Sequence, residues 1–306
     1  MKKIMLIADV VGWVFNRHCD EIRKRMTEYL FDVKFTWQQD PRSYDYQNFD
    51  LVYQLDPMGI PFLSPPREKT IVGLRNEFMY GHTKEGITKF YKEFFEPRCC
   101  MFHVVNRKQF KEFLEIDPSI PLLLTQHGID TNCFAIKDKK IIDKNSPLVL
   151  GVSGNKNSAG EKGFDIIEQA CQLTGCIPLI TKQNLVGTHL SKEQMSTYYN
   201  KIDIYCCMSK SEGLNNCIME AGATAVPVIT TRTGAVEEMI ENGKDGFIIE
   251  RSVDALVEKI NFFKNNREAI PDFGNKFMKT ITENWSWDIR IKDFRRMFDA
   301  FFKLGK

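Results

Sequence analysis

The sequence lacks any long hydrophobic run. A membrane-spanning helix needs roughly 20 apolar residues, and no stretch of the chain approaches that length. The first residues, MKKIMLIAD, hold only a short apolar run before Asp9, whereas a secretory signal needs roughly 7–15 apolar residues. We therefore expect a soluble cytoplasmic protein.

The chain also has almost no net charge. Its 306 residues include 42 Lys and Arg against 40 Asp and Glu, which leaves a formal charge of +2. A balance so close to zero provides no overall electrostatic attraction for nucleic acid or acidic lipid. Nucleic acid is therefore not among the partners we expect.

Cysteine patterns typical of metal sites or disulfide frameworks are missing too. The nine cysteines form no Cys-x-x-Cys motif. Cys99-Cys100 and Cys206-Cys207 are adjacent pairs in apolar runs, which is typical of buried strands. His127 and Cys133 lack two further ligands at suitable spacing. We expect reduced cysteines, no metal and no cofactor.

Several common motifs of nucleotide-binding proteins and hydrolases are absent. The chain has no Gly-x-Gly-x-x-Gly, no Gly-x-x-x-x-Gly-Lys-Ser/Thr and no Gly-x-Ser-x-Gly. These absences argue against dinucleotide binding, a P-loop and the nucleophile elbow of a hydrolase. The absence of Asp-x-Asp argues against a metal-dependent nucleotide-sugar enzyme of the single-domain type.

The dominant pattern that is present is an alternation of short apolar runs with amphipathic stretches. Continuous apolar runs separated by helical segments are typical of parallel sheets covered on both faces. The pattern restarts after a Lys-rich stretch, which predicts an α/β protein with two Rossmann-like domains, residues 1–142 and 143–286. In such folds the ligand binds at the carboxyl ends of the strands, here in a cleft between the domains. The expected strands are Ile4–Ala8, Leu51–Leu55, Thr70–Leu74, Cys100–Val105, Leu122–Thr125, Leu148–Val152, Ile177–Thr181, Ile204–Cys207, Val226–Thr230 and Gly246–Ile249.

The most informative segment begins at Ser209. Glu212 follows a predicted strand, and Glu220 lies eight residues later, about two helical turns further on, in a predicted helix. The loop between them offers free backbone N–H groups and the positive end of the helix, where anions or hydroxyl oxygens can bind. A carboxylate at each end of such a segment suits a ligand rich in hydroxyl groups.

This segment resembles the retaining glycosyltransferases of family 4, whose signature is Glu-x7-Glu. The resemblance extends through Glu220-Ala221-Gly222-Ala223, Val226-Pro227-Val228-Ile229, the Gly turn with Glu at 233–240 and the Asn-Gly loop at 242–247. His127-Gly128-Ile129-Asp130, Glu161-Lys162-Gly163-Phe164 and Trp285-Ser286-Trp287 match further family segments in order. The resemblance implies the GT-B fold, in which two Rossmann-like domains face each other across a cleft. It also implies that a C-terminal helix, residues 287–306, packs back on the first domain.

The resemblance also implies roles for individual residues in the second domain. Glu220 would bind the ribose hydroxyls of the nucleotide, Glu212 the donor sugar, and Lys162 the diphosphate. A fixed cation there stabilises the charge that grows on the leaving diphosphate. The remaining donor-binding residues implied are Gly213, Leu214, Asn215 and Glu238.

One expected residue departs from the family pattern. Asn155 stands where the family has an arginine, and Lys156 or Arg75 could supply the missing charge. Arg75 occupies a position where the family often has histidine; arginine can bind a diphosphate or an acidic acceptor but cannot act as a base. Gly12 and Trp13 resemble the family's Gly loop at the junction of donor and acceptor.

The implied function is transfer of a sugar, with retention of configuration, from a nucleotide diphosphate sugar to a glycan, a lipid-linked or a small-molecule acceptor. The alternatives are a GT-B sugar-nucleotide epimerase or phosphorylase and a non-catalytic nucleotide-sugar binding module. The base pocket is expected near 182–189, and its spacing does not choose between UDP and GDP. The i, i+4 spacing of Phe90, Tyr91, Phe94 and Phe95 also leaves open a docking face for a membrane surface or lipid-linked acceptor.

Overall fold

The computed structural model describes residues 1–57, 65–137, 143, 145–155, 159–183 and 190–304. Contacts divide the chain into two compact units. Unit 1 comprises Met1–His127 and Arg290–Lys306, and unit 2 comprises Gly128–Ile289. None of the helices in the described part of the chain combines the length and apolarity that a membrane span requires.

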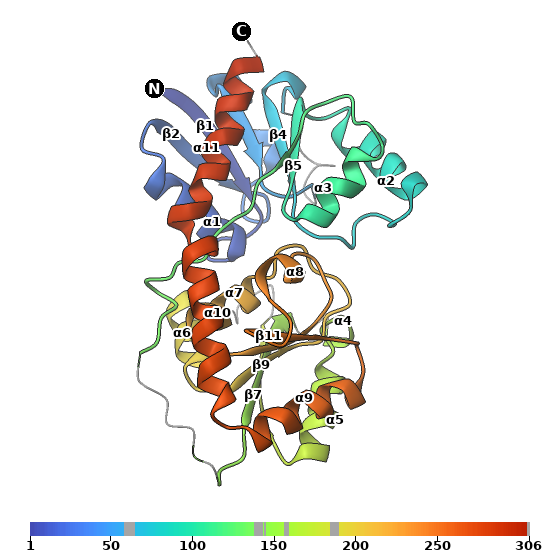
Figure 1. Cartoon of the computed structure of the whole chain (residues 1–306). Helices are drawn as coiled ribbons and strands as arrows, with labels where there is room; N and C mark the ends of the chain where they lie inside the picture. The colour runs from blue at the N-terminus through green and yellow to red at the C-terminus, as the bar shows by residue number, and fades with distance from the viewer. Residues whose placement is uncertain (58–64, 138–142, 144, 156–158, 184–189, 305–306) are drawn as a thin grey trace. The chain divides into compact units, whose positions relative to one another are not determined.

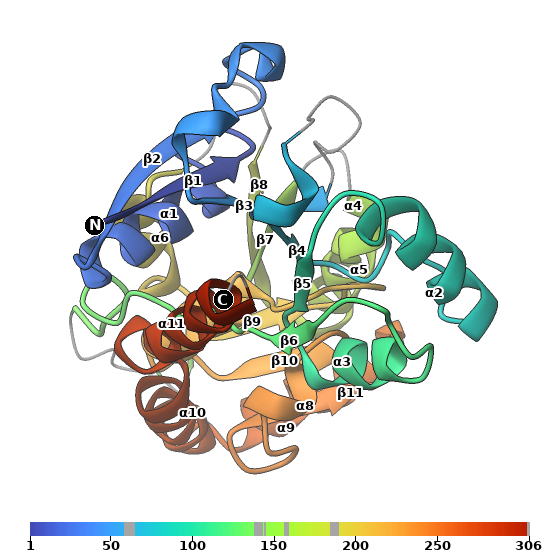
Figure 2. The ribbon, with the colours of Figure 1, turned by 90° about the horizontal axis from the view of Figure 1, so that it is seen from above.

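Unit 1 contains a parallel sheet with the strand order β2-β1-β3-β4-β5-β6, seen from above in Figure 2. The central strands β3, β4 and β5 are buried along their whole length and mostly apolar, as the sequence predicts. The edge strand β2 was not predicted, because its sequence YLFDVKF mixes polar and apolar residues and stays half-exposed. The strands are β1 (Lys2–Ala8), β2 (Tyr29–Phe35), β3 (Leu51–Gln54), β4 (Thr70–Leu74), β5 (Met101–Val104) and β6 (Leu122–Leu124).

Helices connect these strands, and the C-terminal helix packs on the same unit (Figure 1). Phe298 of α11 (Trp287–Leu304) contacts the rings of Tyr29 and Tyr53, with ring centroids 5.9 and 5.8 Å away. This burial supports the expected return of the C-terminal helix to the first domain. The other helices are α1 (Val14–Arg25), α2 (Lys84–Phe90), which continues as the π-helical turn η5 (Tyr91–Phe95), and α3 (Arg107–Leu114), with short 3-10 turns η1 (Pro41–Ser43), η2 (Tyr46–Asn48) and η4 (Arg67–Lys69).

The aromatic residues of α2 and η5 belong to the core of unit 1 rather than to the docking face that their spacing left open. Phe90, Tyr91 and Phe95 are all buried within the apolar cluster of unit 1, and Phe94 packs against that cluster. The π-helical turn places adjacent aromatics on the same buried side, where Phe95 stacks on Phe102 at 4.6 Å. These side chains therefore present no aromatic face to a membrane surface.

Unit 2 also contains a parallel sheet, with the order β11-β10-β9-β7-β8. The first strand of the unit, β7, lies between β8 and β9, so the direction of winding reverses between β7 and β9. Ligands of doubly wound sheets bind at such a switch point, beyond the carboxyl ends of the strands. The strands are β7 (Val149–Asn155), β8 (Ile177–Gln183), β9 (Ile204–Cys207), β10 (Val228–Thr231) and β11 (Gly246–Ile249); the helices are α4 (Ala159–Lys162), α5 (Phe164–Thr174), α6 (Lys192–Tyr199), α7 (Asn216–Ala223), α8 (Val236–Met239), α9 (Val253–Asn265) and α10 (Ala269–Trp285).

The segment that begins at Gly128 belongs to unit 2, so the units divide earlier than the expected boundary after residue 142. Ile129 N–H donates to the Trp285 carbonyl at 2.8 Å, and its own carbonyl accepts from Trp287 N–H at 3.1 Å. Lys192 of α6 pairs with Asp130 at 2.9 Å. These contacts fasten the segment to unit 2 before the Lys-rich stretch is reached.

Candidate functional site

Two oppositely charged residues meet at the switch point of unit 2. Lys162 ends α4, in the connection after β7, and its Nζ donates a hydrogen bond to Oε1 of Glu212, in the loop after β9. Ser209 Oγ donates to the same carboxylate oxygen at 2.7 Å. The two side chains are 27% and 14% exposed, respectively. The pair is therefore partly desolvated yet open to a ligand.

Lys162 stays cationic in this setting. Burial by itself would lower its pKa, but the charge of Glu212, followed by smaller contributions that include a hydrogen bond to the same carboxylate, raises the pKa of Lys162 above its usual value. A cation held in a partly dry site interacts more strongly with an anionic ligand than one in bulk water. The site therefore offers a fixed positive charge beside a carboxylate.

The loops that carry this pair are joined by a third residue. Arg251, just beyond β11, donates from Nε to the Met208 carbonyl at 2.8 Å and from Nη2 to the Gly160 carbonyl at 2.7 Å. One guanidinium thus links the connection after β7 to the loop after β9. Gly163 adds to this close packing, since it has a φ of +68° and a Cβ there would lie 2.6 Å from the Met208 carbonyl oxygen.

The second carboxylate of the Glu-x7-Glu spacing is buried in α7. Glu220 is 6% exposed, and its Oε2 accepts a hydrogen bond from Tyr199 Oη at 2.9 Å. Asn215 begins α7: its Oδ1 accepts from Ile218 N–H at 3.2 Å, and its Nδ2 donates to Cys207 Sγ at 3.2 Å. The N-cap thereby sets where the helix starts relative to β9.

The loop after β10 packs closely on the loop after β9. Ala235 N–H donates to the Gly213 carbonyl at 2.9 Å. A Cβ on Gly234, whose φ is +52°, would lie only 2.1 Å from that carbonyl oxygen. Gly213 and Leu214 are buried beneath this contact, and Glu238 follows in α8, half-buried. The predicted donor residues Glu212, Gly213, Leu214 and Asn215 thus share one ordered turn.

The predicted residues of unit 1 lie in two places. Gly12 adopts a φ of +79°, and its N–H donates to Asn16 Oδ1 at 2.7 Å; Trp13 then caps α1. Arg75 follows β4 and is 7% exposed.

Arg75 is held inside unit 1 by a network of hydrogen bonds. It donates from Nε to the Leu55 carbonyl at 2.9 Å and from Nη2 to Tyr53 Oη at 2.7 Å. Its Nη1 lies 3.2 Å from Nδ1 of His18 and 3.1 Å from Nδ1 of His127. Because a guanidinium only donates, both imidazole nitrogens accept. The Arg75 guanidinium is thus hydrogen-bonded to groups of its own unit.

Some positions of the predicted site lie at or beyond the edge of the described residues. Asn155 ends β7, while Lys156 and most of the expected base pocket, 184–189, lie outside the described residues. Among the described residues, no group of three or more His, Cys, Asp or Glu side chains is placed to hold a metal ion.

Three supporting residues escaped the sequence analysis. Ser209 lies only three residues before Glu212, and this short spacing could have identified it as a hydrogen-bond donor to the Glu212 carboxylate. Tyr199 and Arg251 are distant in sequence from the carboxylate and carbonyls that they contact, and no motif marks them.

Residues 140–279 match the family model of glycosyl transferases, group 1. The chain is 32% identical over 158 residues to the capsular polysaccharide biosynthesis glycosyltransferase CapM of Staphylococcus aureus, a match that covers 51% of this chain and 38% of that protein. It is 31% identical over 93 residues to a GDP-mannose-dependent phosphatidylinositol monomannoside mannosyltransferase of Mycobacterium tuberculosis, covering 29% of this chain and 24% of that protein. The chain thus spans less than half the length of these curated relatives.

Likeness to solved structures extends over both units. Anabaena HepE in complex with UDP and glucose superposes with a TM-score of 0.73 and 11% identity, covering 98% of this chain and 100% of that one. A glycosyltransferase of Rickettsia africae superposes with a TM-score of 0.69 and 14% identity, covering 99% of each chain. The two Rossmann-like sheets are those of the GT-B fold, which confirms the predicted fold class.

Proposed function

We propose that this chain is a glycosyltransferase that moves a sugar from a nucleotide diphosphate sugar to an acceptor hydroxyl with retention of configuration. The observation that carries the proposal is the Lys162–Glu212 pair at the switch point of unit 2, with Glu220 eight residues further on. It lies within the residues that match group 1 glycosyl transferases. The retaining stereochemistry and membership of family 4 rest on the Glu-x7-Glu resemblance.

In this mechanism Lys162 binds the diphosphate of the donor. The bond between the anomeric carbon and the diphosphate oxygen breaks, and the electron pair stays on the diphosphate. The Lys162 ammonium stabilises that developing charge. Because Glu212 already pairs with Lys162, the diphosphate would draw the lysine away and leave the carboxylate to accept hydrogen bonds from the sugar hydroxyls.

The acceptor attacks the anomeric carbon from the face that the diphosphate leaves. The new bond joins the acceptor oxygen to that carbon, and the acceptor proton passes to an oxygen of the departing diphosphate. Glu220 would accept hydrogen bonds from the two ribose hydroxyls, as a carboxylate can bind such a pair. Tyr199, which donates to Glu220, would hold the carboxylate in position.

The nucleotide base is a choice between two candidates. A UDP complex is known for Anabaena HepE, and the mycobacterial relative is a GDP-mannose-dependent enzyme. We therefore propose thermal-shift titration of the whole chain with UDP, GDP and their sugars. A ligand at about 100 times its Kd stabilises the fold by about 2.7 kcal/mol, which is readily measured.

The deciding experiment measures turnover of the nucleotide sugar that binds best. Slow release of free sugar and nucleotide diphosphate, with an anomeric proton signal of the retained configuration in transfer products, supports the proposal. Interconversion to an epimeric nucleotide sugar would indicate an epimerase, and binding without turnover would indicate a binding module. We expect activity to survive EDTA, because Lys162 supplies the positive charge; loss restored by Mn²⁺ would contradict this.

A further inference from the structure

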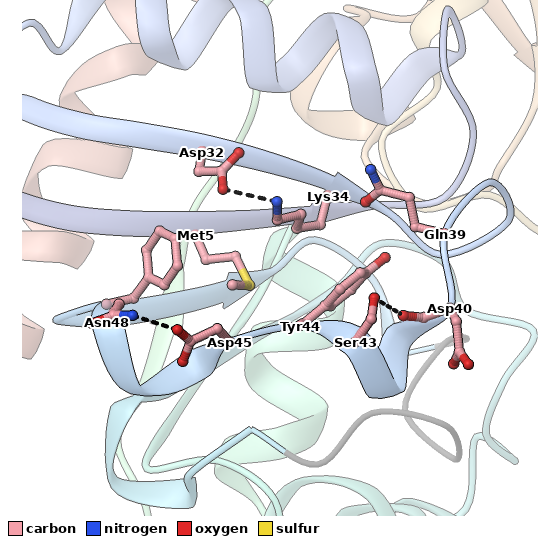
Figure 3. Close-up of a pocket in the computed structure, with 10 residues that line it drawn as sticks. Met5, Asp32, Lys34, Gln39, Asp40, Ser43, Tyr44, Asp45 and Asn48 are labelled. Carbon is pink, nitrogen blue, oxygen red and sulfur yellow. Dashed lines mark hydrogen bonds and ion pairs between the residues drawn. The ribbon is translucent and has the colours of Figure 1, made fainter.

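A cavity of about 490 Å³ lies entirely within unit 1 (Figure 3). Its floor comes from β1 and β2, and the segment between β2 and β3, which includes the turns η1 and η2, closes it from the other side. The lining is mostly polar: Asp32, Lys34, Gln39, Asp40, Ser43, Tyr44, Asp45 and Asn48, with Met5 and Phe49 as apolar members.

The charged groups of this cavity are already compensated. Lys34 Nζ pairs with Asp32 at 3.0 Å, and both oxygens of Asp40 accept from Arg42, at 2.8 Å to Nη2. Asp45 accepts from Gln47 N–H at 3.2 Å and from the Asn48 amide. The lining therefore presents carboxylates whose charges are satisfied by hydrogen-bond donors of the protein itself.

This compensation disfavours ionic ligands. A metal ion would have to compete with Arg42, Lys34 and Asn48 for the same oxygens. An anion would meet three carboxylates and a single lysine that is already paired. Oxygens with remaining lone pairs still accept hydrogen bonds, and the amides of Gln39 and Asn48 offer both donors and acceptors.

Tyr44 supplies a second and independent observation. Its side chain is 7% exposed, and its hydroxyl has no hydrogen-bond partner among the described residues. Figure 3 shows its ring lying across the cavity, with the hydroxyl directed to the side where Gln39 lies. The ring is fixed by packing in a small core with Met5, Ile7 and Val52. Buried hydroxyls normally have a partner, so this group is placed to bond a polar atom that enters the cavity.

We propose that this cavity binds a neutral saccharide unit. Sugar hydroxyls donate to carboxylates and accept from amide, ammonium and phenol groups, which are the groups present here. The partly exposed ring of Phe49 matches the C–H face of a sugar ring, while Met5 is fully buried. Identifying this saccharide as part of the acceptor rests on the proposed function.

The test uses the whole chain and three named probes: methyl glucoside, methyl mannoside and maltose. Saturation-transfer NMR should show contact with at least one of them, and calorimetry then provides its affinity. Tyr44→Phe, which removes only the hydroxyl, should weaken that affinity about tenfold. Gln39→Trp, an exposed change that adds bulk at the cavity, should block binding even if Tyr44→Phe folds poorly.

Tyr46→Phe is the matched control, because it deletes a neighbouring hydroxyl that does not line the cavity, and its affinity should equal that of the wild type. Equal binding by the wild type and Gln39→Trp, no binding of any probe, or binding of Ca²⁺ in place of sugars would each overturn the proposal. Titration with UDP and GDP in the same samples separates the two hypotheses. Sugar binding without nucleotide binding would refute the proposed function alone, and the reverse result would refute the saccharide cavity alone.

Discussion

Each unit contains its own parallel sheet, but the predicted cations Lys162 and Arg75 lie in different surroundings. In unit 2, Lys162 faces a carboxylate at the switch point between β7 and β9, where it remains partly exposed. In unit 1 the sheet reverses between β1 and β3, and the predicted cation Arg75 is buried in a network with Leu55, Tyr53 and two histidines. The same type of sheet thus carries a partly exposed cation in one unit and a buried, hydrogen-bonded cation in the other.

The two units also differ in how far the comparisons with known proteins extend over them. The family match covers 140–279 and lies entirely within unit 2, whereas the fold match covers 98% of the chain. Under the proposed function, residues that bind the donor are restricted in type and spacing, as the Glu-x7-Glu spacing of Glu212 and Glu220 suggests.

Loss of the Lys162 cation in unit 2 should lower turnover more than any other substitution considered. We expect Lys162→Ala to lower turnover of the nucleotide sugar on the order of 10²-fold or more, since removal of one group that stabilises developing charge has that effect. Steady-state kinetics provides the measurement. Lys210→Ala is the control: its exposed pair with Glu161 lies nearby, and activity should stay within twofold of the wild type. A similarly small change for Lys162→Ala would remove the assigned role.

Loss of the cation in unit 1 should affect stability instead. Arg75→Met leaves the Leu55 carbonyl and Tyr53 hydroxyl without their donor, and we expect unit 1 to lose about 3 kcal/mol, from buried hydrogen bonds to a charged group. Hydrogen exchange followed by mass spectrometry should show faster exchange in β3, β4 and β5 than in β7 and β9. If turnover falls while exchange stays unchanged, Arg75 binds a ligand and the contrast between the units fails.

Removal of the buried carboxylate should weaken nucleotide binding. Glu220→Gln replaces a charged acceptor, and we expect affinity for bare UDP or GDP to fall by about 10–150-fold, the effect of roughly 1.5–3 kcal/mol. Tyr199→Phe keeps the carboxylate but deletes its donor, so it should produce a smaller loss. Calorimetry distinguishes these outcomes, and wild-type affinity in Glu220→Gln would exclude the ribose role.

The sequence predicts the buried elements well because their patterns are local. Continuous apolar runs locate β4 and β9 almost to the residue, and the Glu-x7-Glu spacing locates the loop and helix of the candidate site. The half-exposed strand β2 has no such pattern. The Lys162–Glu212 contact joins positions 50 apart in the chain. This contact and the bonds of Arg251 depend on which strands are neighbours, which periodicity alone does not specify.

Substitution of Arg251 should lower turnover moderately, because Arg251 joins the two loops that preorganise the candidate site of unit 2. Arg251→Met releases the two loops that carry Lys162 and Glu212 but touches neither side chain. We expect kcat to fall about tenfold, within the range reported for small misplacements of reacting groups, with bare nucleotide affinity little changed. Arg251→Lys, which can reach one carbonyl, should recover part of the loss. Equal loss of nucleotide affinity and turnover would argue for general unfolding instead.

The smallest effect concerns the pH dependence of unit 1. Burial, and then the charge of Arg75, holds the pKa of His103 well below its usual value, so the folded chain keeps this imidazole neutral. An unfolded histidine binds a proton near pH 6.5. Below that pH the unfolded state takes up more protons, so the free energy of unfolding falls as the pH falls.

For His103 alone the loss between pH 7.5 and 6.0 should be about 0.8 kcal/mol. Urea unfolding of the wild type and of His103→Gln at both pH values isolates this contribution, because all other titrating groups are common to both proteins. The wild type should lose more stability than the variant on acidification. The unit 2 sheet contains no corresponding buried imidazole in its described strands, so hydrogen exchange in β7 and β9 should respond less than exchange in β5. Equal acid sensitivity of the wild type and His103→Gln would show that His103 does not distinguish the two units.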